Sequence, residues 1–302
     1  MENPGCPRWQ QPARILGWML GASVMACLGE PVANRPRWQV AYPAATNGKA
    51  AESAAVAMSG GPLMVAVVTP GADAAHPALS MGNQKVAVRE IGHDPVSSLS
   101  FLKVEGGAAP NAMEWRSDAG GVVNAPLQAM TANGPVKCHA TGWTQQVGTK
   151  ILPLALLQVT FEQTVPLPGT PLLDPQGRVA AIVFQSAGTG KVGYAIPAEA
   201  VHRVQRDLAN GGQLIRGYLG LSLRAEIKAP KVVKVLPNSP AAAAGIHAGD
   251  VLLEVGSRKI SSYADAANAF FYLIPGQPVQ VKLLRGTSKL EVTLTPTRPS
   301  AR

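Results

Sequence analysis

The chain has 302 residues, of which 46% are hydrophobic and 15% are charged, and its formal net charge is +9. This length predicts two domains, and the apolar fraction excludes a mainly disordered chain. Only one apolar run exceeds ten residues, which excludes a protein with several membrane spans. Three cysteines exclude a disulfide framework, and 31 Gly with 26 Pro indicate many short strands and turns.

Residues 1–28 have the features of an export signal. Arg8 and Arg14 precede fourteen uncharged residues, Ile15–Leu28, which are too few to span a bilayer. Val24–Cys27 also resembles the lipobox of bacterial lipoproteins, and in that alternative the lipidated Cys27 would anchor the chain to a membrane. In both cases we expect a protein exported to the periplasm or cell envelope of a bacterium. Cys138 is then the one thiol left in the fold, and we expect it in the core.

Residues 29–58 have no sustained periodicity and are rich in Ala, Pro and Asn, so we expect a linker or mobile arm there. Residues 59–212 predict a domain of short strands that ends in a helix. The helix is expected over 197–208, with an apolar face, and Gly211-Gly212 ends it. The expected strands share β-branched and alternating apolar residues; they cover 63–69, 85–91, 99–104, 136–141, 151–161, 179–185 and 192–196.

Residues 213–297 predict a second domain, followed by a short tail at 298–302. Ser239 can cap a short helix over 241–244, with Pro240 in its first turn. Ser261 or Ser262 can cap a longer helix that runs through Leu273. The expected strands cover 218–223, 232–236, 251–255, 279–284 and 290–294.

The order of these elements resembles a bacterial PDZ domain over about residues 217–296. The motifs are Gly217-Tyr-Leu-Gly-Leu, Val235-Leu-Pro-Asn-Ser-Pro-Ala-Ala-Ala-Ala-Gly-Ile and Ala248-Gly-Asp-Val-Leu-Leu-Glu-Val. The resemblance implies an α+β fold that binds an extended peptide C-terminus as an added strand.

The resemblance also assigns parts of the binding groove. Leu219–Leu223 would be the open sheet edge, and the loop Arg216–Gly220 would offer backbone N–H groups to the terminal carboxylate, helped by Gly217 and Gly220. On the opposite helix, Ala266, Phe270 and Leu273 form one stripe; we expect Leu273 in the core, whereas Ala266 and Phe270 can belong to core or groove. The expected peptide-binding residues are Gly217, Tyr218, Leu219, Gly220, Leu221, Leu223, Ala266 and Phe270.

Charge agrees with a carboxylate ligand, because residues 217–302 carry +6 of the total +9. No aromatic residues interleave these charges, so nucleic acid is not an expected partner. The five histidines are scattered without ligand spacing, and we expect neither a metal nor a cofactor.

The end of the first domain resembles the HtrA/DegP family of trypsin-like serine proteases. The motifs are Gly169-Thr-Pro-Leu-Leu-Asp-Pro-Gln-Gly-Arg-Val-Ala-Ala-Ile, which follows the family's nucleophile, and Gly193-Tyr-Ala-Ile-Pro, which leads into its PDZ domain. The resemblance implies a mainly β chain, in which a chymotrypsin-like double β-barrel precedes the α+β PDZ domain. It also implies a homo-oligomer.

The family's catalytic positions hold other residues in this chain. Aligning the family's Gly-Asn-Ser-Gly-Gly-Pro-Leu on Pro171-Leu172 puts Pro168 at the nucleophile, and proline has neither a hydroxyl nor a backbone N–H. The same comparison puts Ser98 at the aspartate and Ala72 at the histidine. A Ser-His-Asp mechanism needs all three side chains, so the triad is degenerate.

Two functions follow. The first is a non-catalytic scaffold or sensor in the cell envelope that binds peptide C-termini or extended segments. The alternative is a serine-type endopeptidase with a displaced site formed by His76, Asp94 and Thr170. We expect Ser186, another hydroxyl near the site, to lie in a turn before Gly188.

Overall fold

The computed structural model describes residues 38–59, 61–107, 112–118, 121–147, 150–188, 190–209, 216–224 and 230–298. All of them fall within one unit, Ala33–Arg302. The expected leader, including Cys27, lies outside the described residues, as do the arm up to residue 37 and the tail after residue 298. No helix in the described part of the chain is long and apolar enough to cross a membrane.

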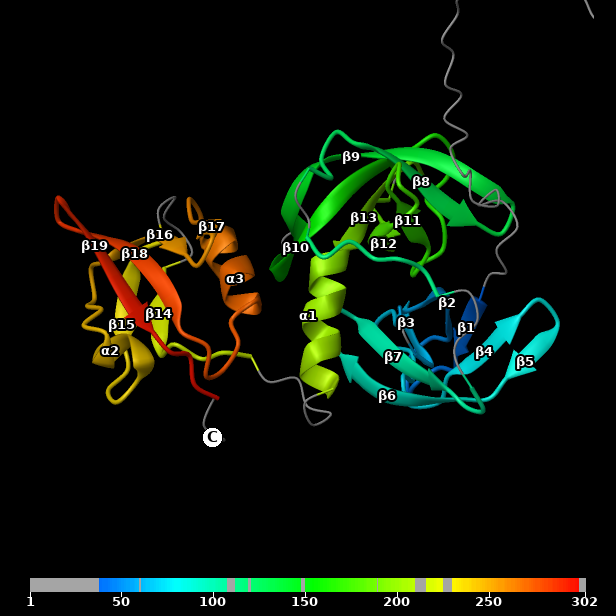
Figure 1. Ribbon diagram of the computed structural model, residues 1–302, viewed down its shortest axis with the longest axis horizontal. Helices are drawn as coiled ribbons and strands as arrows, with labels where there is room; N and C mark the ends of the chain where they lie inside the picture. Colours follow the sequence, from blue (N-terminus) through cyan, green and yellow to red (C-terminus); the bar gives the residue numbers. More distant parts are fainter. Residues whose placement is uncertain are drawn as a thin grey trace, which may run out of the picture. The chain divides into compact units, whose positions relative to one another are not determined.

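Seven antiparallel strands form the N-terminal sheet, in the order β5-β4-β1-β2-β3-β7-β6 (Figure 1). The strands are β1 (Trp38–Tyr42), β2 (Ala51–Ala57), β3 (Leu63–Val67), β4 (Ala78–Met81), β5 (Gln84–Val86), β6 (Val88–Asp94) and β7 (Leu99–Val104). The strands expected over 63–69 and 99–104 are confirmed as β3 and β7. The one expected over 85–91 is divided between β5 and β6 at Ala87.

The expectation of a linker or arm over 29–58 is wrong for residues 38–58, because β1 and β2 lie in the middle of this sheet. In β1, Trp38, Val40 and Tyr42 are buried while the residues between them are exposed, which is the alternation of a strand with one face in the core. β2 is rich in alanine, a residue with a low strand preference, and neighbouring strands on both sides hold it in place. The first domain therefore includes these residues.

A closed barrel follows, with the strand order β10-β13-β12-β11-β8-β9. The strands are β8 (Pro126–Thr131), β9 (Gly134–Val147), β10 (Lys150–Phe161), β11 (Pro171–Leu173), β12 (Val179–Ser186) and β13 (Val192–Pro197). The four strands expected between 136 and 196 are confirmed. Cys138 lies in the barrel core, as expected, and burial raises the pKa of its thiol to about 12. This thiol is a packing group.

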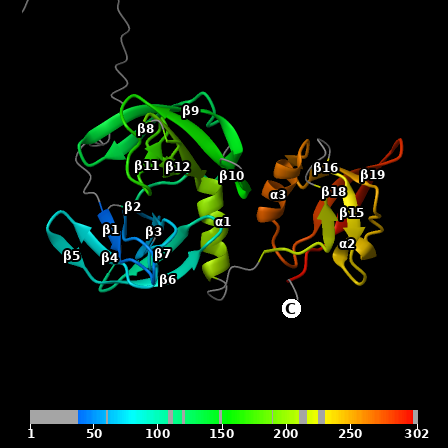
Figure 2. The same cartoon turned by 180° about the vertical axis from the view of Figure 1, so that it is seen from behind.

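Helix α1 (Ala198–Ala209) starts directly after β13 and agrees with the helix expected over 197–208. Val201, Val204 and Leu208 are buried along one face. The helix contacts β6 and β7 of the N-terminal sheet as well as β12 and β13 of the barrel (Figures 1 and 2). It therefore packs against both parts of the first domain.

The C-terminal module (residues 216–224 and 230–298) contains a two-stranded sheet, β14-β15, and a four-stranded sheet, β17-β16-β18-β19. Its elements are β14 (Leu221–Leu223), β15 (Val232–Val235), α2 (Pro240–Ala243), β16 (Val251–Val255), β17 (Arg258–Lys259), α3 (Tyr263–Phe271), β18 (Val279–Arg285) and β19 (Ser288–Leu294). Ser239 caps α2 as expected, and of the two candidates for α3 the cap is Ser262.

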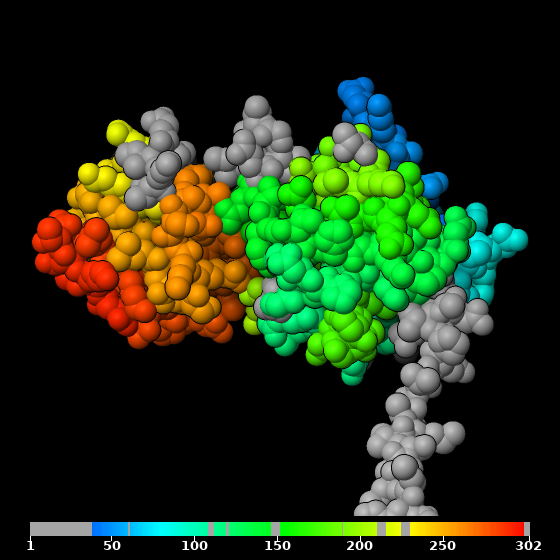
Figure 3. Space-filling model, turned by 90° about the horizontal axis from the view of Figure 1, so that it is seen from above, coloured from blue at the N-terminus to red at the C-terminus, as the bar shows by residue number. Residues whose placement is uncertain are grey.

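Helix α3 contacts β10 of the closed barrel. Figure 3 shows the surface of the chain, with the C-terminal module in yellow to red. The side-chain oxygen of Asn268 accepts a hydrogen bond of 2.9 Å from the backbone N–H of Ala155. Ala155 lies where the pairing of β10 with β9 is irregular, so the N–H finds its acceptor on the helix and not on a strand. The prediction of a mainly β chain with barrel-type and α+β parts is confirmed.

Candidate functional site

Strand β14 has one edge paired with β15 and a second edge that pairs with no strand in the described part of the chain. Toward β15, the Gly220 carbonyl accepts from the N–H of Leu236 at 2.8 Å, and the N–H of Arg224 donates to Lys231 at 3.1 Å. Because backbone groups alternate along a strand, those of Leu221 and Leu223 face the unpaired edge. This edge can accept an extended peptide.

The loop before β14 has fewer free N–H groups than the sequence suggests. The N–H of Gly217 donates to the carbonyl of Leu273 at 3.0 Å, and Tyr218 exchanges two backbone hydrogen bonds with Thr297. No described residue accepts from the N–H groups of Leu219 and Gly220. A terminal carboxylate therefore has these two donors, followed by the N–H of Leu221 on the open edge.

The glycines of this loop are needed for packing inside the module. At Gly220, φ is +76°, and a Cβ atom would lie 2.1 Å from the Cβ of Ser239. At Gly217, a Cβ would lie 2.8 Å from the Cβ atoms of Leu273 and Pro296. The close approach expected at these positions is thus made to the protein's own side chains.

The stripe on α3 divides between core and groove. Ala266 is fully buried and Leu273 is 5% exposed, so both belong to the core of the module, and the prediction for Leu273 is confirmed. Phe270 is only partly buried, and so are Leu221 and Leu223 on β14. These three apolar side chains are the ones that can contact a peptide between strand and helix.

The position aligned with the nucleophile packs against β2. The carbonyl of Pro168 accepts hydrogen bonds from the N–H of Ala54 at 2.7 Å and from Ser53 Oγ at 3.0 Å. At Gly169, φ is +78°, and a Cβ atom would lie 2.0 Å from the carbonyl oxygen of Ala54. The loop and the strand are therefore in direct contact at the position that the sequence alignment assigns to the nucleophile.

The other two aligned positions carry no group for acid–base chemistry. Ser98 adopts φ +60°, is buried, and its carbonyl accepts from the N–H of Val68 at 2.8 Å. Ala72 pairs with Ala44 in an isolated bridge. Neither side chain can act as the imidazole base or the carboxylate of a catalytic triad.

The residues of the displaced site are each bonded elsewhere. Thr170 is 3% exposed, and its Oγ1 donates to the carbonyl of Leu167 at 2.7 Å. His76 is exposed, and its Nδ1 lies 2.6 Å from Asp73, whose carboxyl pKa is lowered chiefly by this hydrogen bond. Thr170 thus donates its hydroxyl proton to a carbonyl and not to an imidazole.

Asp94 is buried and serves as an acceptor for its own turn. Its carboxylate accepts from the backbone N–H of Val96 and from the N–H and hydroxyl of Ser97. It also forms an ion pair of 2.7 Å with Arg216, at the start of the C-terminal module. Ser186 is expected in a turn, but it is the last residue of β12 and pairs with Gly193; its Oγ accepts from the N–H of Gly188 at 3.3 Å, just after the strand.

Sequence reasoning missed the buried cation that joins the first domain to the C-terminal module. Arg203 of α1 is 1% exposed, donates to the carbonyl of Leu273 at 2.7 Å, and forms an ion pair with Asp207. The spacing of Arg203 and Asp207, four apart on a helix, predicts their pairing. Nothing in the sequence indicates that Arg203 would also bond to the second module.

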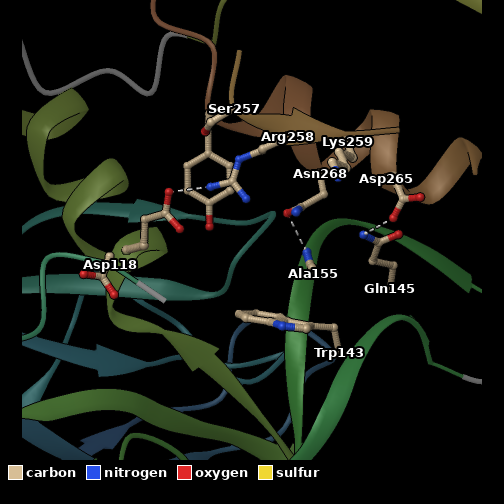
Figure 4. A pocket seen from close by; sticks show the side chains of 11 residues that line it. Asp118, Trp143, Gln145, Ala155, Ser257, Arg258, Lys259, Asp265 and Asn268 are labelled. Atoms are coloured by element: carbon tan, nitrogen blue, oxygen red, sulfur yellow. Dashed lines mark hydrogen bonds and ion pairs between the residues drawn. The ribbon is translucent and has the colours of Figure 1, made fainter. Parts of the chain in front are cut away.

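A cavity of about 540 Å³ lies beside α3 (Figure 4). Its lining consists of Asp118, Trp143, Gln145, Ala155, Glu199, Ser257, Arg258, Lys259, Asp265, Asn268 and Tyr272. Arg258 pairs with Glu199 and lies 3.8 Å from the ring centre of Tyr272, and Gln145 donates to Asp265. None of the expected catalytic or peptide-binding residues lines it. In the described residues, no group of three His, Cys, Asp or Glu side chains could hold a metal ion.

Comparisons with known proteins agree with both resemblances. Residues 217–295 match the PDZ domain family. The "Probable periplasmic serine endoprotease DegP-like" of Chlamydia trachomatis serovar D is 27% identical over 242 residues, which cover 71% of this chain and 47% of the relative. "Periplasmic serine endoprotease DegP" of Escherichia coli K12 is 35% identical over 126 residues, or 38% of this chain and 27% of the relative.

Solved structures extend the similarity in fold. "HtrA-type protease AlgW with tripeptide" superimposes with a TM-score of 0.65 at 21% identity, over 89% of this chain and 96% of that one. The serine endoprotease from Yersinia pestis gives a TM-score of 0.57 at 23% identity, over 88% and 95%. The chain spans about half the length of the DegP-like relatives that match about 70% of it. The chain is thus similar to HtrA/DegP proteins in sequence, shares the trypsin-like fold of the HtrA-type structures, and contains a PDZ domain.

Proposed function

We propose that this HtrA/DegP-like chain is a non-catalytic protein that binds peptide C-termini or extended segments through its PDZ domain, as a scaffold or sensor in the bacterial cell envelope. The observation that carries the proposal is the contact at Pro168. A residue without a hydroxyl occupies the nucleophile position, and its carbonyl is held by two hydrogen bonds from β2. Without a nucleophile there is no covalent route to peptide hydrolysis.

The neighbouring side chains support the same proposal. An activated threonine would need its hydroxyl within reach of a base, whereas Thr170 donates to a carbonyl inside its own loop. A catalytic carboxylate would orient an imidazole, whereas Asp94 pairs with Arg216. If Thr170 and Asp94 do not act in catalysis, the PDZ domain is the part of the chain that offers an accessible binding edge.

Export supports a role in the envelope. The predicted leader of residues 1–28 and the periplasmic relatives point to the same compartment. Two further proposals depend on this one: Cys27 anchors the chain to a membrane if the leader is of the lipoprotein type, and the protein forms a homo-oligomer, as the resemblance implies. Mass spectrometry of the membrane fraction and light scattering of the purified protein test them separately.

The alternative function is a serine-type endopeptidase with a displaced site, which the similarity to serine endoproteases favours. Incubating unfolded casein with the purified protein distinguishes the two. We expect no cleavage above that of buffer alone. Cleavage that disappears in a His76→Ala, Thr170→Ala double variant would establish the endopeptidase, because no other protein in the preparation would respond to those changes.

Binding is tested with fluorescent eight-residue peptides that end in an apolar residue, with a free or an amidated C-terminus. We expect only the free carboxylate to bind, since the proposed donors are the N–H groups of Leu219 and Gly220. Phe270→Arg should abolish binding because it puts a charge in the apolar groove. Val96→Arg, at an exposed apolar residue of the first domain, is the matched control. Unchanged affinity in Phe270→Arg would refute the groove.

A further inference from the structure

Strand pairing gives the sheet β14-β15 an inner and an outer face. Leu221 pairs with Val235 and Leu223 pairs with Val232, and these four side chains pack against the core of the module. Side chains alternate along a strand, so Ser222 lies on the outer face, opposite Lys234. Both residues are exposed.

Three cations occupy this outer face, which we call the basic face: Arg224, Lys231 and Lys234. All three are exposed, and the N–H of Arg224 bonds to the carbonyl of Lys231, which places the two residues next to each other across the strands. Within the described residues, none of the three has a carboxylate within 4.0 Å. Lys282 and Arg285 on β18, by contrast, both have acidic partners.

We propose that the groove selects peptides with acidic residues at the first and third positions before the C-terminal residue. This inference rests on the proposed function, with the terminal carboxylate at the N–H groups of Leu219 and Gly220 and the peptide antiparallel to β14. That register sets the C-terminal residue opposite Leu221 and the penultimate residue opposite Ser222. Two residues further along the peptide, the third position before the end lies opposite Arg224.

The side chains at those two peptide positions point to the basic face, because directly opposed residues of antiparallel strands lie on the same side of the sheet. On the basic face, the penultimate side chain of the peptide lies in one row across the strands with Ser222 and Lys234. The side chain at the third position before the end lies in the next row, with Arg224 and Lys231. Each favourable cross-strand charge pair strengthens binding by about 1.5- to 5-fold. Two rows together predict a preference of about 2- to 25-fold for acidic over neutral peptides.

Fluorescence anisotropy with the purified full chain tests the preference. Four eight-residue peptides share one apolar C-terminal residue and carry Asp, Ser or Lys at both selected positions; the fourth is the Asp peptide with an amidated end. We expect affinity to fall from Asp to Ser to Lys at low salt. The differences should shrink at high salt, because exposed charges are screened within about 8 Å already at physiological ionic strength.

The outcomes separate this inference from the proposed function. Equal affinities for the Asp, Ser and Lys peptides, together with loss of binding by the amidated Asp peptide, would overturn the acidic preference and leave C-terminal recognition intact. Equal binding of the free and amidated Asp peptides would overturn C-terminal recognition, and binding by none of the peptides would overturn both.

Charge-reversal variants locate the effect. Arg224→Glu combined with Lys234→Glu should weaken the Asp peptide by about tenfold and strengthen the Lys peptide. Lys289→Glu, at an exposed position of β19 in the other sheet, makes the same kind of change away from the basic face. An equal loss in Lys289→Glu would show a general effect of net charge, and the basic face would then not be the determinant.

Discussion

Gly220 combines two constraints, a positive φ and a close contact, that a comparison with a second glycine can separate. Its φ of +76° strains any other residue, and a Cβ atom there would also meet the side chain of Ser239 at 2.1 Å. Gly286 has φ +59° in a turn and nothing within 4 Å of its would-be Cβ, so it carries the backbone constraint alone. Comparing the two positions measures what the close contact adds.

We predict that Gly220→Ala lowers the free energy of unfolding by about 2–4 kcal/mol, from backbone strain plus overpacking. Gly286→Ala should cost only about 1 kcal/mol. Urea unfolding followed by tryptophan fluorescence and circular dichroism gives both values. Equal losses would mean that Ser239, the cap of α2, moves enough to accommodate the new methyl group without further cost.

Asp250 gives the module a dependence on pH. Its carboxylate is buried, lies 2.8 Å from Arg285, and accepts from the N–H of His247. The hydrogen bond from Arg285 is the main cause that lowers the pKa of Asp250. A folded-state pKa below the unfolded value of about 3.9 stabilises the fold above that value, and this stabilisation disappears as pH falls through the folded pKa.

We therefore predict that Asp250→Asn is less stable than the parent protein at pH 7 and that the difference shrinks steadily below about pH 4. Asparagine keeps one oxygen that can accept from His247, but its NH2 group replaces the oxygen that accepts from Arg285 Nε, so the change removes the charge together with one hydrogen bond. Only the charge makes the difference depend on pH. Thermal melts from pH 7 down to pH 2.5 measure the difference. A constant difference across this range would contradict the assignment to ionisation of Asp250.

Hydrogen bonds from strand β2 hold the loop that precedes the short strand β11. β11 has only three residues and follows the loop that contains Pro168, and β2 is the strand that binds this loop. Ser53 of β2 donates to Pro168 and also accepts from the buried N–H of Val67 on β3. One hydroxyl thus links three segments of the first domain.

We predict that Ser53→Ala lowers the free energy of unfolding by about 1–3 kcal/mol, because it leaves the buried N–H of Val67 without its acceptor. Ser288→Ala on β19 removes an exposed hydroxyl and should change stability by less than about 0.5 kcal/mol. Chemical denaturation of the two variants measures the comparison. A neutral Ser53→Ala would show that β2 and the loop are held by the backbone hydrogen bond of Ala54 alone.

Elements with strong alternation or an unmistakable cap could be predicted from the sequence. Val251–Val255 is a strand with its predicted ends, and the serine caps of α2 and α3 follow from local hydrogen bonding. β2 could not, because alanine has a low strand preference and the pairing with β1 and β3 holds this segment as a strand. The same holds for the loop before β14, where distant residues use the N–H groups of Gly217 and Tyr218.

For the molecule as a whole, the sequence predicts the two kinds of domain but not what holds them together. Three contacts join α1, β6 and β10 to the C-terminal module: Arg203 with Leu273, Arg216 with Asp94, and Asn268 with Ala155. Each links residues more than 60 positions apart. Arg216 also lies 4.6 Å from the ring centre of Phe271. Pairings at this range depend on tertiary packing, which no local pattern encodes.

Arg203 should contribute most to this connection because its guanidinium is buried. Arg203→Met keeps much of the side-chain volume but removes the donor to Leu273 and the ion-pair partner of the mostly buried Asp207. Breaking a buried pair by removing one partner typically costs about 3–5 kcal/mol. We predict that the variant weakens the contact between α1 and the module, and that the N–H of Ala155 then exchanges faster because its acceptor, Asn268, belongs to that module.

Hydrogen exchange measured by NMR or mass spectrometry reports on Ala155 directly. The amides of β12, a barrel strand paired on both sides with core side chains, are the internal reference, since their protection depends on the barrel. Lys282→Met, which breaks an exposed ion pair on β18, is the matched loss of one cation and should leave Ala155 protected. If Arg203→Met raises exchange in β12 as much as at Ala155, the arginine stabilises the whole first domain and not the link to the PDZ domain.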